Sequence, residues 1–266
     1  MDLKERNNLQ QETWTVGDFP KMGVELSIVG EMLCESVPVY AGDKVLDVAT
    51  ASGNTALAAA RRRAVVTGVD ITPVLLERAR QRAAAEGLSI DFQLGDATAL
   101  VFADASFDVV MSTFGAIFAP HPEKTASEMA RVCRSGGKIA MANWTPDGLL
   151  GKLFRLLARF SPSDAQVDAP VSWGDQAVLK KRLQPYVIDM RIRREIVRFR
   201  SLTPDHWVDF MKRYFGPAIL AFQYSSPAAG EKLAAEMADL ISEYNRATNG
   251  TVLSESEYLD IVATRR

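Results

Sequence analysis

Between residues 43 and 145, the hydrophobic positions form two alternating patterns. Short apolar runs, such as 44–48 and 65–70, are typical of strands that are buried on both faces of a sheet. The segments between these runs repeat apolar residues every three or four positions, as helices that cover a sheet do. This alternation predicts an α/β fold with an open, doubly wound, mostly parallel sheet.

The helix after the second predicted strand has the clearest limits. Thr72 is expected as its N-cap, Pro73 as its first residue and Gly87 as its stop. A later helix over 122–134 is expected to end at a turn over 135–137. The strands predicted in this half are 44–48, 65–70, 90–94, 107–111 and 138–143, and the other helix covers 55–60.

The second half of the chain loses this rhythm after residue 146. It holds helical segments near 149–160, 204–214 and 228–245, a strand-like run at 192–199 and a last strand at 258–264. Because the last strand has to return to the sheet, we expect one domain with seven strands and not two folding units. Its predicted parts are an N-terminal cap (1–39), a core (40–145), a lid region (146–250, with one strand near 192–200) and the last strand (251–266).

Composition and charge narrow the classes of function. The 266 residues are 47% hydrophobic and 24% charged, which is typical of a soluble globular protein, and the net charge of −2 does not favour nucleic acid. The basic run over 191–200 suits the solvent side of an edge strand. Cys34 and Cys133 are too isolated to indicate a disulfide framework or a zinc site. Without an apolar leader or spanning segment, we expect a cytoplasmic protein.

Residues 47–54 (DVATASGN) carry the strongest candidate chemistry. They follow the first predicted strand, at the edge where open α/β sheets bind ligands. Small residues at 49, 51 and 53 let the backbone approach a ligand, and the N-terminus of the next helix favours a negative group. The spacing differs from the G-x-G-x-x-G of dinucleotide enzymes. The alternative interpretation is a tight turn with no ligand.

This segment resembles motif I of the class I methyltransferases, in which an acid precedes three glycines at alternate positions. In that family the loop holds the methionine part of S-adenosylmethionine. Ala49 and Ala51 stand where the family usually has glycine. Because a positive φ costs alanine more than glycine, we expect ordinary backbone angles at both positions.

Two further acids follow the next two predicted strands. Asp70 ends the second strand, where a carboxylate can accept hydrogen bonds from both ribose hydroxyls. Asp96 lies in 95–100 (GDATAL), which resembles the family's Gly-Asp-Ala element, whose acid accepts from the adenine amino group. Singly, these acids also fit a solvated strand end or a turn. Three acids on successive strand ends favour a nucleoside site.

The resemblance extends from about residue 40 to 145 and is closest to the ubiquinone/menaquinone-methyltransferase-like branch. The segments 107–113 and 128–138 resemble the family's fourth strand and its helix-turn-strand element, and 13–19 resembles a cap segment. The resemblance implies S-adenosyl-L-methionine as cofactor and no metal. It implies these cofactor-binding residues: Trp14, Asp47, Ala49, Ala51, Gly53, Asn54, Asp70, Ile71, Asp96, Ala97, Thr98 and Ser112.

Aromatic residues in the predicted lid segments favour a largely apolar pocket for a planar or hydrophobic acceptor, although packing within the lid explains them too. A base is needed only if the acceptor loses a proton. His206, in the first turn of a lid helix, is the candidate base, and His121 is interpreted as a helix cap. The candidate pocket residues are Phe19, Phe114, Phe118, Trp144, Trp173, Trp207 and Tyr214.

The sequence therefore predicts methyl transfer from S-adenosylmethionine to an oxygen, nitrogen or carbon of a small aromatic or lipophilic metabolite. An NAD(P)-dependent oxidoreductase is the first alternative, and the loop spacing disfavours it. A non-catalytic cofactor-binding regulator is the second, because Ala49 and Ala51 depart from the family pattern. We expect a small-molecule substrate with no nucleic-acid or membrane partner, and a homodimer is compatible with the sequence.

Overall fold

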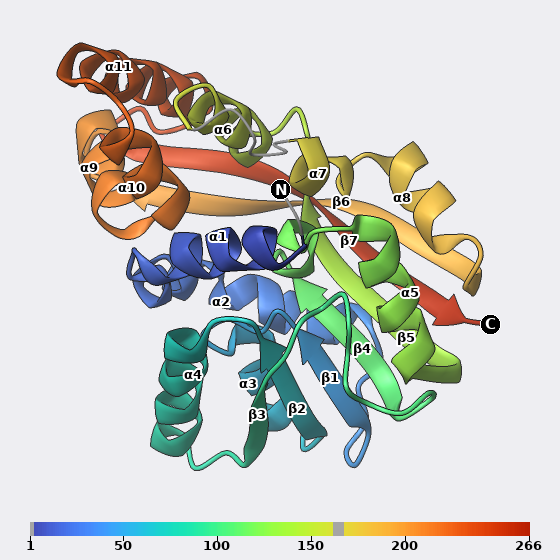
Figure 1. The fold of residues 1–266 in the computed structure, drawn as a ribbon. Coiled ribbons are helices and arrows are strands. Elements are labelled where there is room, and N and C mark those ends of the chain that lie inside the picture. Colours follow the sequence, from blue (N-terminus) through green and yellow to red (C-terminus); the bar gives the residue numbers. More distant parts are fainter. Residues whose placement is uncertain (1–2, 162–167) are drawn as a thin grey trace.

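The computed structural model describes residues 3–161 and 168–266. Its strands form one seven-stranded sheet in the order β3-β2-β1-β4-β5-β7-β6, and β7 runs antiparallel to both of its neighbours (Figure 1). The sheet is therefore mostly parallel and seven-stranded, as predicted. The strands are β1 (Lys44–Val48), β2 (Val65–Asp70), β3 (Ile90–Leu94), β4 (Phe107–Thr113), β5 (Cys133–Trp144), β6 (Val187–Ser201) and β7 (Val252–Arg265).

Helices cover both faces of this sheet. Val45 and Val109 belong to one buried cluster, and their chain neighbours Leu46 and Val110 belong to another. Successive strand residues point to opposite faces, so the two clusters lie on the two sides of the sheet. The helices on the first side include α3 (Asn54–Arg61) and α4 (Pro73–Ala85), and those on the second include α5 (Pro122–Val132), α6 (Leu149–Ala158) and α8 (Gln176–Leu183).

The remaining helices lie near the ends of the strands. Figure 1 shows α1 (Leu3–Thr15) across the tips of the parallel strands, with α2 (Phe19–Ser36) beneath it. The second half of the chain adds α9 (Pro204–Tyr214), α10 (Gly216–Gln223) and α11 (Pro227–Glu243) around the far ends of β6 and β7. A short α7 (Asp168–Ser172) and a 3-10 turn, η1 (Ala116–Phe118), complete the described elements.

The limits of α4 are those that the sequence predicts. Thr72 is the N-cap, Pro73 begins the helix, and Gly87 has a positive φ of 66° just beyond its end. Proline fits the first turn because its missing N–H is not needed there, and glycine accepts the left-handed conformation without strain.

The predicted turn at 135–137 is wrong. Helix α5 ends at Val132, and β5 begins at Cys133 and continues through these residues. Across β4 and β5, Phe107 pairs with Cys133 and Val109 with Lys138, so the register shifts and the extra residues form a bulge. Gly136 adopts a φ of +73° within it. The Ser-Gly-Gly run marks an irregularity inside a strand.

Strands β6 and β7 are both longer than the apolar runs that predicted them. They pair with each other over their whole lengths, and polar residues continue the pairing beyond those runs. The basic run does not lie on one solvent side of edge strand β6 as predicted, because successive strand residues point to opposite faces. Arg194 and Arg198 share one face and pair with Glu257 and Glu255, whereas Arg191 lies on the other face and donates to the Ser36 carbonyl on α2. No helix within 3–161 or 168–266 is long and apolar enough to cross a membrane.

Candidate functional site

A pocket opens at the carboxyl ends of β1, β2 and β4, beneath α1 and α2. Its lining changes character along its length. Polar side chains that follow the strands gather at one end, whereas the lining from α6, β6 and Phe215, which lies between α9 and α10, is apolar. Of the predicted cofactor-binding residues, those that line the pocket are Trp14, Asp47, Ala49, Ala51, Asn54, Asp70, Ile71, Asp96 and Ala97.

The loop after β1 has the opposite backbone geometry from the predicted one. Ala49 and Ala51 have φ angles of +55° and +48°, so both adopt the left-handed conformation that was expected only of glycine. Two contacts hold this conformation in place. The Ala51 N–H donates to Asp70 Oδ2 (2.8 Å), and Gly115 packs so closely that an added Cβ would lie 2.3 Å from the Ala49 carbonyl oxygen. The tertiary environment therefore stabilises a strained loop.

Asp47 supports this loop from below. Its Oδ2 accepts hydrogen bonds from the Thr50 hydroxyl (2.6 Å) and the Ala56 N–H (3.0 Å). Burial raises the pKa of the Asp47 carboxyl from 3.8 to about 7, although these hydrogen bonds act in the opposite direction. The side chain is only 1% exposed, so it acts mainly by ordering the turn into α3.

Asp70 contacts the same loop from the end of β2. Its Oδ2 accepts from the Ala51 N–H and its Oδ1 from the Thr72 N–H, both at 2.8 Å. Burial raises the pKa of the Asp70 carboxyl, and the backbone N–H groups partly offset that effect. Asp70 also lines the pocket, so its carboxylate borders the space that a ligand would occupy.

Asp96 lies at the next strand end and is held by three donors. Its Oδ1 accepts from the N–H and the hydroxyl of Thr98 (2.7 and 2.8 Å), as an aspartate in a turn does. Its Oδ2 accepts from Asn7 Nδ2 (2.8 Å), which reaches down from α1. The N-terminal cap therefore closes on the strand ends through a direct hydrogen bond.

Three predicted cofactor residues lie behind the lining and not in it: Gly53, Thr98 and Ser112. Gly53 takes a φ of +86° as the N-cap of α3, and Thr98 donates to Asp96. Ser112 donates to the Val48 carbonyl (2.7 Å) and accepts from the Ala116 N–H (3.0 Å). These residues shape the pocket wall without reaching its space.

Sequence reasoning missed most of the contacts that hold the cap. Gln11 Nε2 donates to the Ile71 carbonyl (2.6 Å), and Asn54 Nδ2 donates to the Gly23 carbonyl on α2 (2.7 Å). Helix α1 is polar on all sides, so no periodic apolar stripe indicated which of its residues face the protein. The lining residues that the prediction did not include are Asn7, Gln10, Met22, Leu26, Thr50, Ser52, Thr55, Leu75, Gly95, Thr113, Gly115, Ala119, Pro120, Leu150, Phe154, Phe199 and Phe215.

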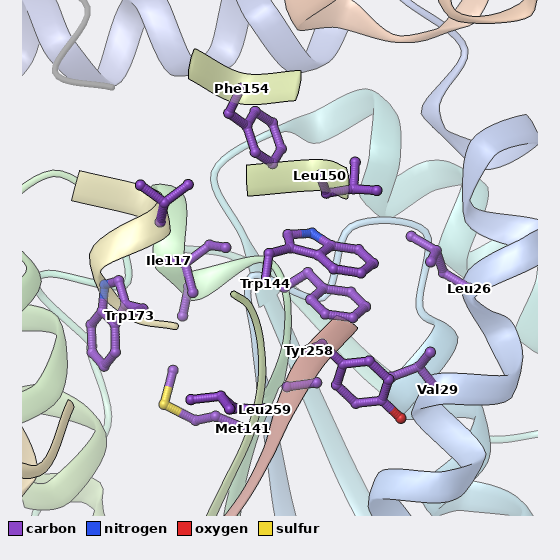
Figure 2. Close-up of a cluster of buried hydrophobic side chains, with 14 of the residues drawn as sticks. Leu26, Val29, Ile117, Met141, Trp144, Leu150, Phe154, Trp173, Tyr258 and Leu259 are labelled. Carbon is purple, nitrogen blue, oxygen red and sulfur yellow. The ribbon is translucent and has the colours of Figure 1, made fainter. Parts of the chain in front are cut away.

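The other end of the pocket is aromatic. Phe114 stacks on Trp144 with ring centroids 3.6 Å apart and planes within 3°, and the Phe114 φ of +61° is a further strained angle. Phe118 meets Trp14 edge-on at 4.9 Å and Phe154 at 5.2 Å. Figure 2 shows Leu150 and Phe154 above Trp144, with Tyr258 below it. Phe19 also lines the pocket.

The predicted pocket residues Trp173, Trp207 and Tyr214 do not line it. Trp173 is fully buried under the Arg182 guanidinium, 4.4 Å from its ring, and Figure 2 shows it on the opposite side of the cluster from Leu26. Trp207 is buried in the core. Tyr214 packs against Phe210, with ring centroids 5.0 Å apart. The aromatic content of the lid thus includes ordinary core packing.

The candidate base His206 is also outside the pocket. Its exposed ring pairs with the Ser201 hydroxyl through Nδ1 at 2.6 Å. The backbone N–H of His206 donates to the Thr203 hydroxyl, which caps α9. His121 is the N-cap residue of α5, but its side chain makes no capping hydrogen bond. No group of three His, Cys, Asp or Glu residues in the described segments is arranged to hold a metal ion.

Comparison with known proteins gives the family. A methyltransferase domain model matches residues 45–137, which span the strand-end acids and the loop after β1. The chain belongs to the class I S-adenosylmethionine-dependent methyltransferases. It is 40% identical to an uncharacterized protein of Mycobacterium tuberculosis over 239 residues, which cover 88% of this chain and 87% of that protein.

Other relatives are similar over part of the chain or in fold alone. A demethylmenaquinone methyltransferase of Deinococcus radiodurans is 42% identical over 118 residues, which are 42% of this chain and 48% of that enzyme. The Bacillus subtilis YcgJ structure has a TM-score of 0.55 at 20% identity, covering 89% of this chain and 97% of that one. The structure of a Haemonchus contortus phosphoethanolamine N-methyltransferase in complex with S-adenosylhomocysteine has a TM-score of 0.55 at 18% identity. The match covers 87% of this chain and 51% of that one.

Proposed function

We propose that this methyltransferase transfers a methyl group from S-adenosylmethionine to an oxygen, nitrogen or carbon atom of a small aromatic or lipophilic molecule. The observation that carries the proposal is one continuous pocket with two chemically different ends. Carboxylates and backbone polar groups suit a nucleoside with an amino-acid tail at one end. Stacked and edge-on aromatic rings suit a planar or apolar acceptor at the other.

The residues at the polar end fit the cofactor. Ala49 and Ala51 have small side chains, and their left-handed angles fold the loop back so that its backbone lines the pocket. The N-terminus of α3 follows and favours a carboxylate. Asp70 would accept from the ribose hydroxyls, and the Asp96 turn would lie at the adenine. When bound, the cofactor supplies a methyl group that its sulfonium already activates.

The chain itself would then orient the acceptor and exclude water. Phe118, Phe154 and Trp144 come from different elements and enclose the apolar end, which removes water from the reacting atoms. Among the described lining residues, the only titratable side chains are Asp47, Asp70 and Asp96, all on the strand ends at the polar side. This favours an acceptor that is nucleophilic without a protein base, such as an amine, an ionised phenol or an enolate carbon.

The loop favours this function over the alternatives. Nicotinamide dinucleotides need close backbone approach along a pyrophosphate, which the G-x-G-x-x-G spacing supplies and residues 47–54 lack. A nucleic-acid substrate is disfavoured because acidic partners on β7 neutralise part of the basic stripe on β6. A small-molecule acceptor agrees with the enclosed aromatic lining.

The test has two stages. Isothermal titration calorimetry compares S-adenosylhomocysteine with NAD(H) and NADP(H), and we expect binding of S-adenosylhomocysteine alone. Phenols, quinols and amines are then incubated with S-adenosylmethionine, and mass spectrometry detects a gain of one methyl group. Tight dinucleotide binding would support the oxidoreductase instead. Cofactor binding without transfer to any acceptor would support the regulator.

A further inference from the structure

The side chain of Gln10 lies on the wall of the pocket, between its two ends. Asn7, Gln10 and Trp14 all line the pocket, and their spacing of three and four residues places them on one face of α1. Asn7 contacts Asp96 at the polar end, and Trp14 packs edge-on against Phe118 at the aromatic end. Gln10 therefore lies where the nucleoside end meets the acceptor end.

Trp14 fixes the direction of the Gln10 amide. An indole nitrogen can only donate a hydrogen bond, and that of Trp14 donates to Gln10 Oε1 at 3.1 Å. The other amide atom, Nε2, therefore points away from the indole. It donates to no described residue, and it is not one of the buried polar atoms that lack a partner, so it is accessible. Gln10 thus offers two free N–H donors beside the aromatic end.

Free N–H donors at this place suit an oxygen of the acceptor. They bind the lone pairs of an oxygen, and they bind an ionised oxygen most strongly. A primary aromatic amine carries N–H donors of its own, which would face those of Nε2. The titratable lining residues that the structure describes are all at the polar end, so an oxygen acceptor has to lose its proton to water before it reacts. Hydrogen bonds to the oxygen favour that ionised state.

We propose that Gln10 Nε2 donates a hydrogen bond to the oxygen of a planar phenol or enol acceptor, and that this contact selects such an acceptor over an aromatic amine. Trp14 is then a positioning residue, because its indole holds the amide in the orientation that presents Nε2. This inference rests on the proposed function and narrows its acceptor class. The discrimination arises because an amine would leave the Nε2 donors unpaired or facing other donors.

The experiment uses the full chain saturated with S-adenosylhomocysteine, with 4-nitrophenol as the phenol probe and 4-nitroaniline as the matching amine. We expect 4-nitrophenol to bind more tightly. Gln10→Glu should weaken it about tenfold or more, because a carboxylate still accepts from the Trp14 indole but cannot donate to the probe. Gln10→Met removes the donors without adding charge and should act in the same direction. Asn8→Asp is the matched control, because it adds the same charge at an exposed residue of α1, and it should change neither affinity.

Absorbance gives a readout that a purely structural role of Gln10 would not change. The ionised form of 4-nitrophenol absorbs at a longer wavelength than the neutral form, so the bound probe reports its own ionisation. At a pH where the free probe is half ionised, the ionised share of the bound probe should be smaller in both Gln10 variants than in the unmodified chain. Thermal melting of each variant checks folding.

Each outcome separates the two proposals. Equal affinities of the unmodified chain for the two probes, or no binding of 4-nitrophenol, would overturn the role of Gln10 while leaving cofactor binding intact. An unchanged 4-nitrophenol affinity in both Gln10 variants would overturn it too. A loss of S-adenosylhomocysteine affinity in Gln10→Met, with the probe preference retained, would assign Nε2 to the cofactor instead. Failure of the unmodified chain to bind S-adenosylhomocysteine at all would overturn the proposed function itself.

Discussion

Because the backbone of the loop after β1 is strained at Ala51, we predict that Ala51→Gly stabilises the protein. A left-handed conformation costs an alanine about 1–2 kcal/mol relative to glycine. Glycine loses about 0.5–1 kcal/mol more in backbone entropy on folding, which offsets part of that gain. The φ of +48° at Ala51 therefore predicts a net increase in the free energy of unfolding of about 0.5–1 kcal/mol.

The assay is urea denaturation of the ligand-free protein, followed by tryptophan fluorescence. Thermal melting should show an increase of about 1–4 °C, given the size of the chain. Ala235→Gly is the control, because Ala235 is exposed in the middle of α11. The same substitution in an ordinary helix should destabilise by about 0.5–1 kcal/mol. If both variants lose stability equally, the positive φ at Ala51 does not carry the strain that we assign to it.

Three predictions concern the pocket. Asp70→Ala should weaken S-adenosylhomocysteine binding about tenfold or more, as loss of charge-assisted hydrogen bonds does, and unchanged calorimetric affinity would contradict the ribose assignment. Because burial raises the pKa of Asp47 from 3.8 to about 7, the folded protein binds more protons there than the unfolded chain between these pH values. The free energy of unfolding should thus fall as pH rises through that window, and Asp47→Asn should flatten the fall in urea titrations. Phe118→Ala should raise the acceptor KM about tenfold in steady-state kinetics through lost apolar contact. It should leave the cofactor affinity unchanged, and Phe222→Ala, outside the lining, should change neither.

Local chemistry made much of the fold readable from the sequence. Strands that are buried on both faces need apolar runs, so β1, β2 and β4 are visible directly, whereas edge strand β3 is visible as an alternation of apolar and polar residues. Pro73 and Gly87 limit α4 because each has a backbone preference that suits one end of a helix. The strand-end acids follow from topology, since the carboxyl ends of parallel strands meet at one edge. These features depend on neighbours in the chain and not on distant packing.

Distant packing decided the rest. The left-handed angle at Ala51 exists because Asp70 accepts its N–H, and that partner lies 19 residues away. Phe154 and Trp173 are both aromatic residues of the second half, but only Phe154 lines the pocket. The reason is that α6, which carries Phe154, lies over the pocket, whereas Trp173 is buried against Arg182. No sequence pattern indicated that Asn7 lines the pocket, because α1 is mostly polar and has no apolar stripe to mark the side that packs on the protein. The sequence determines which elements form and where the acids fall, whereas the side chains that surround a ligand depend on how those elements meet in space.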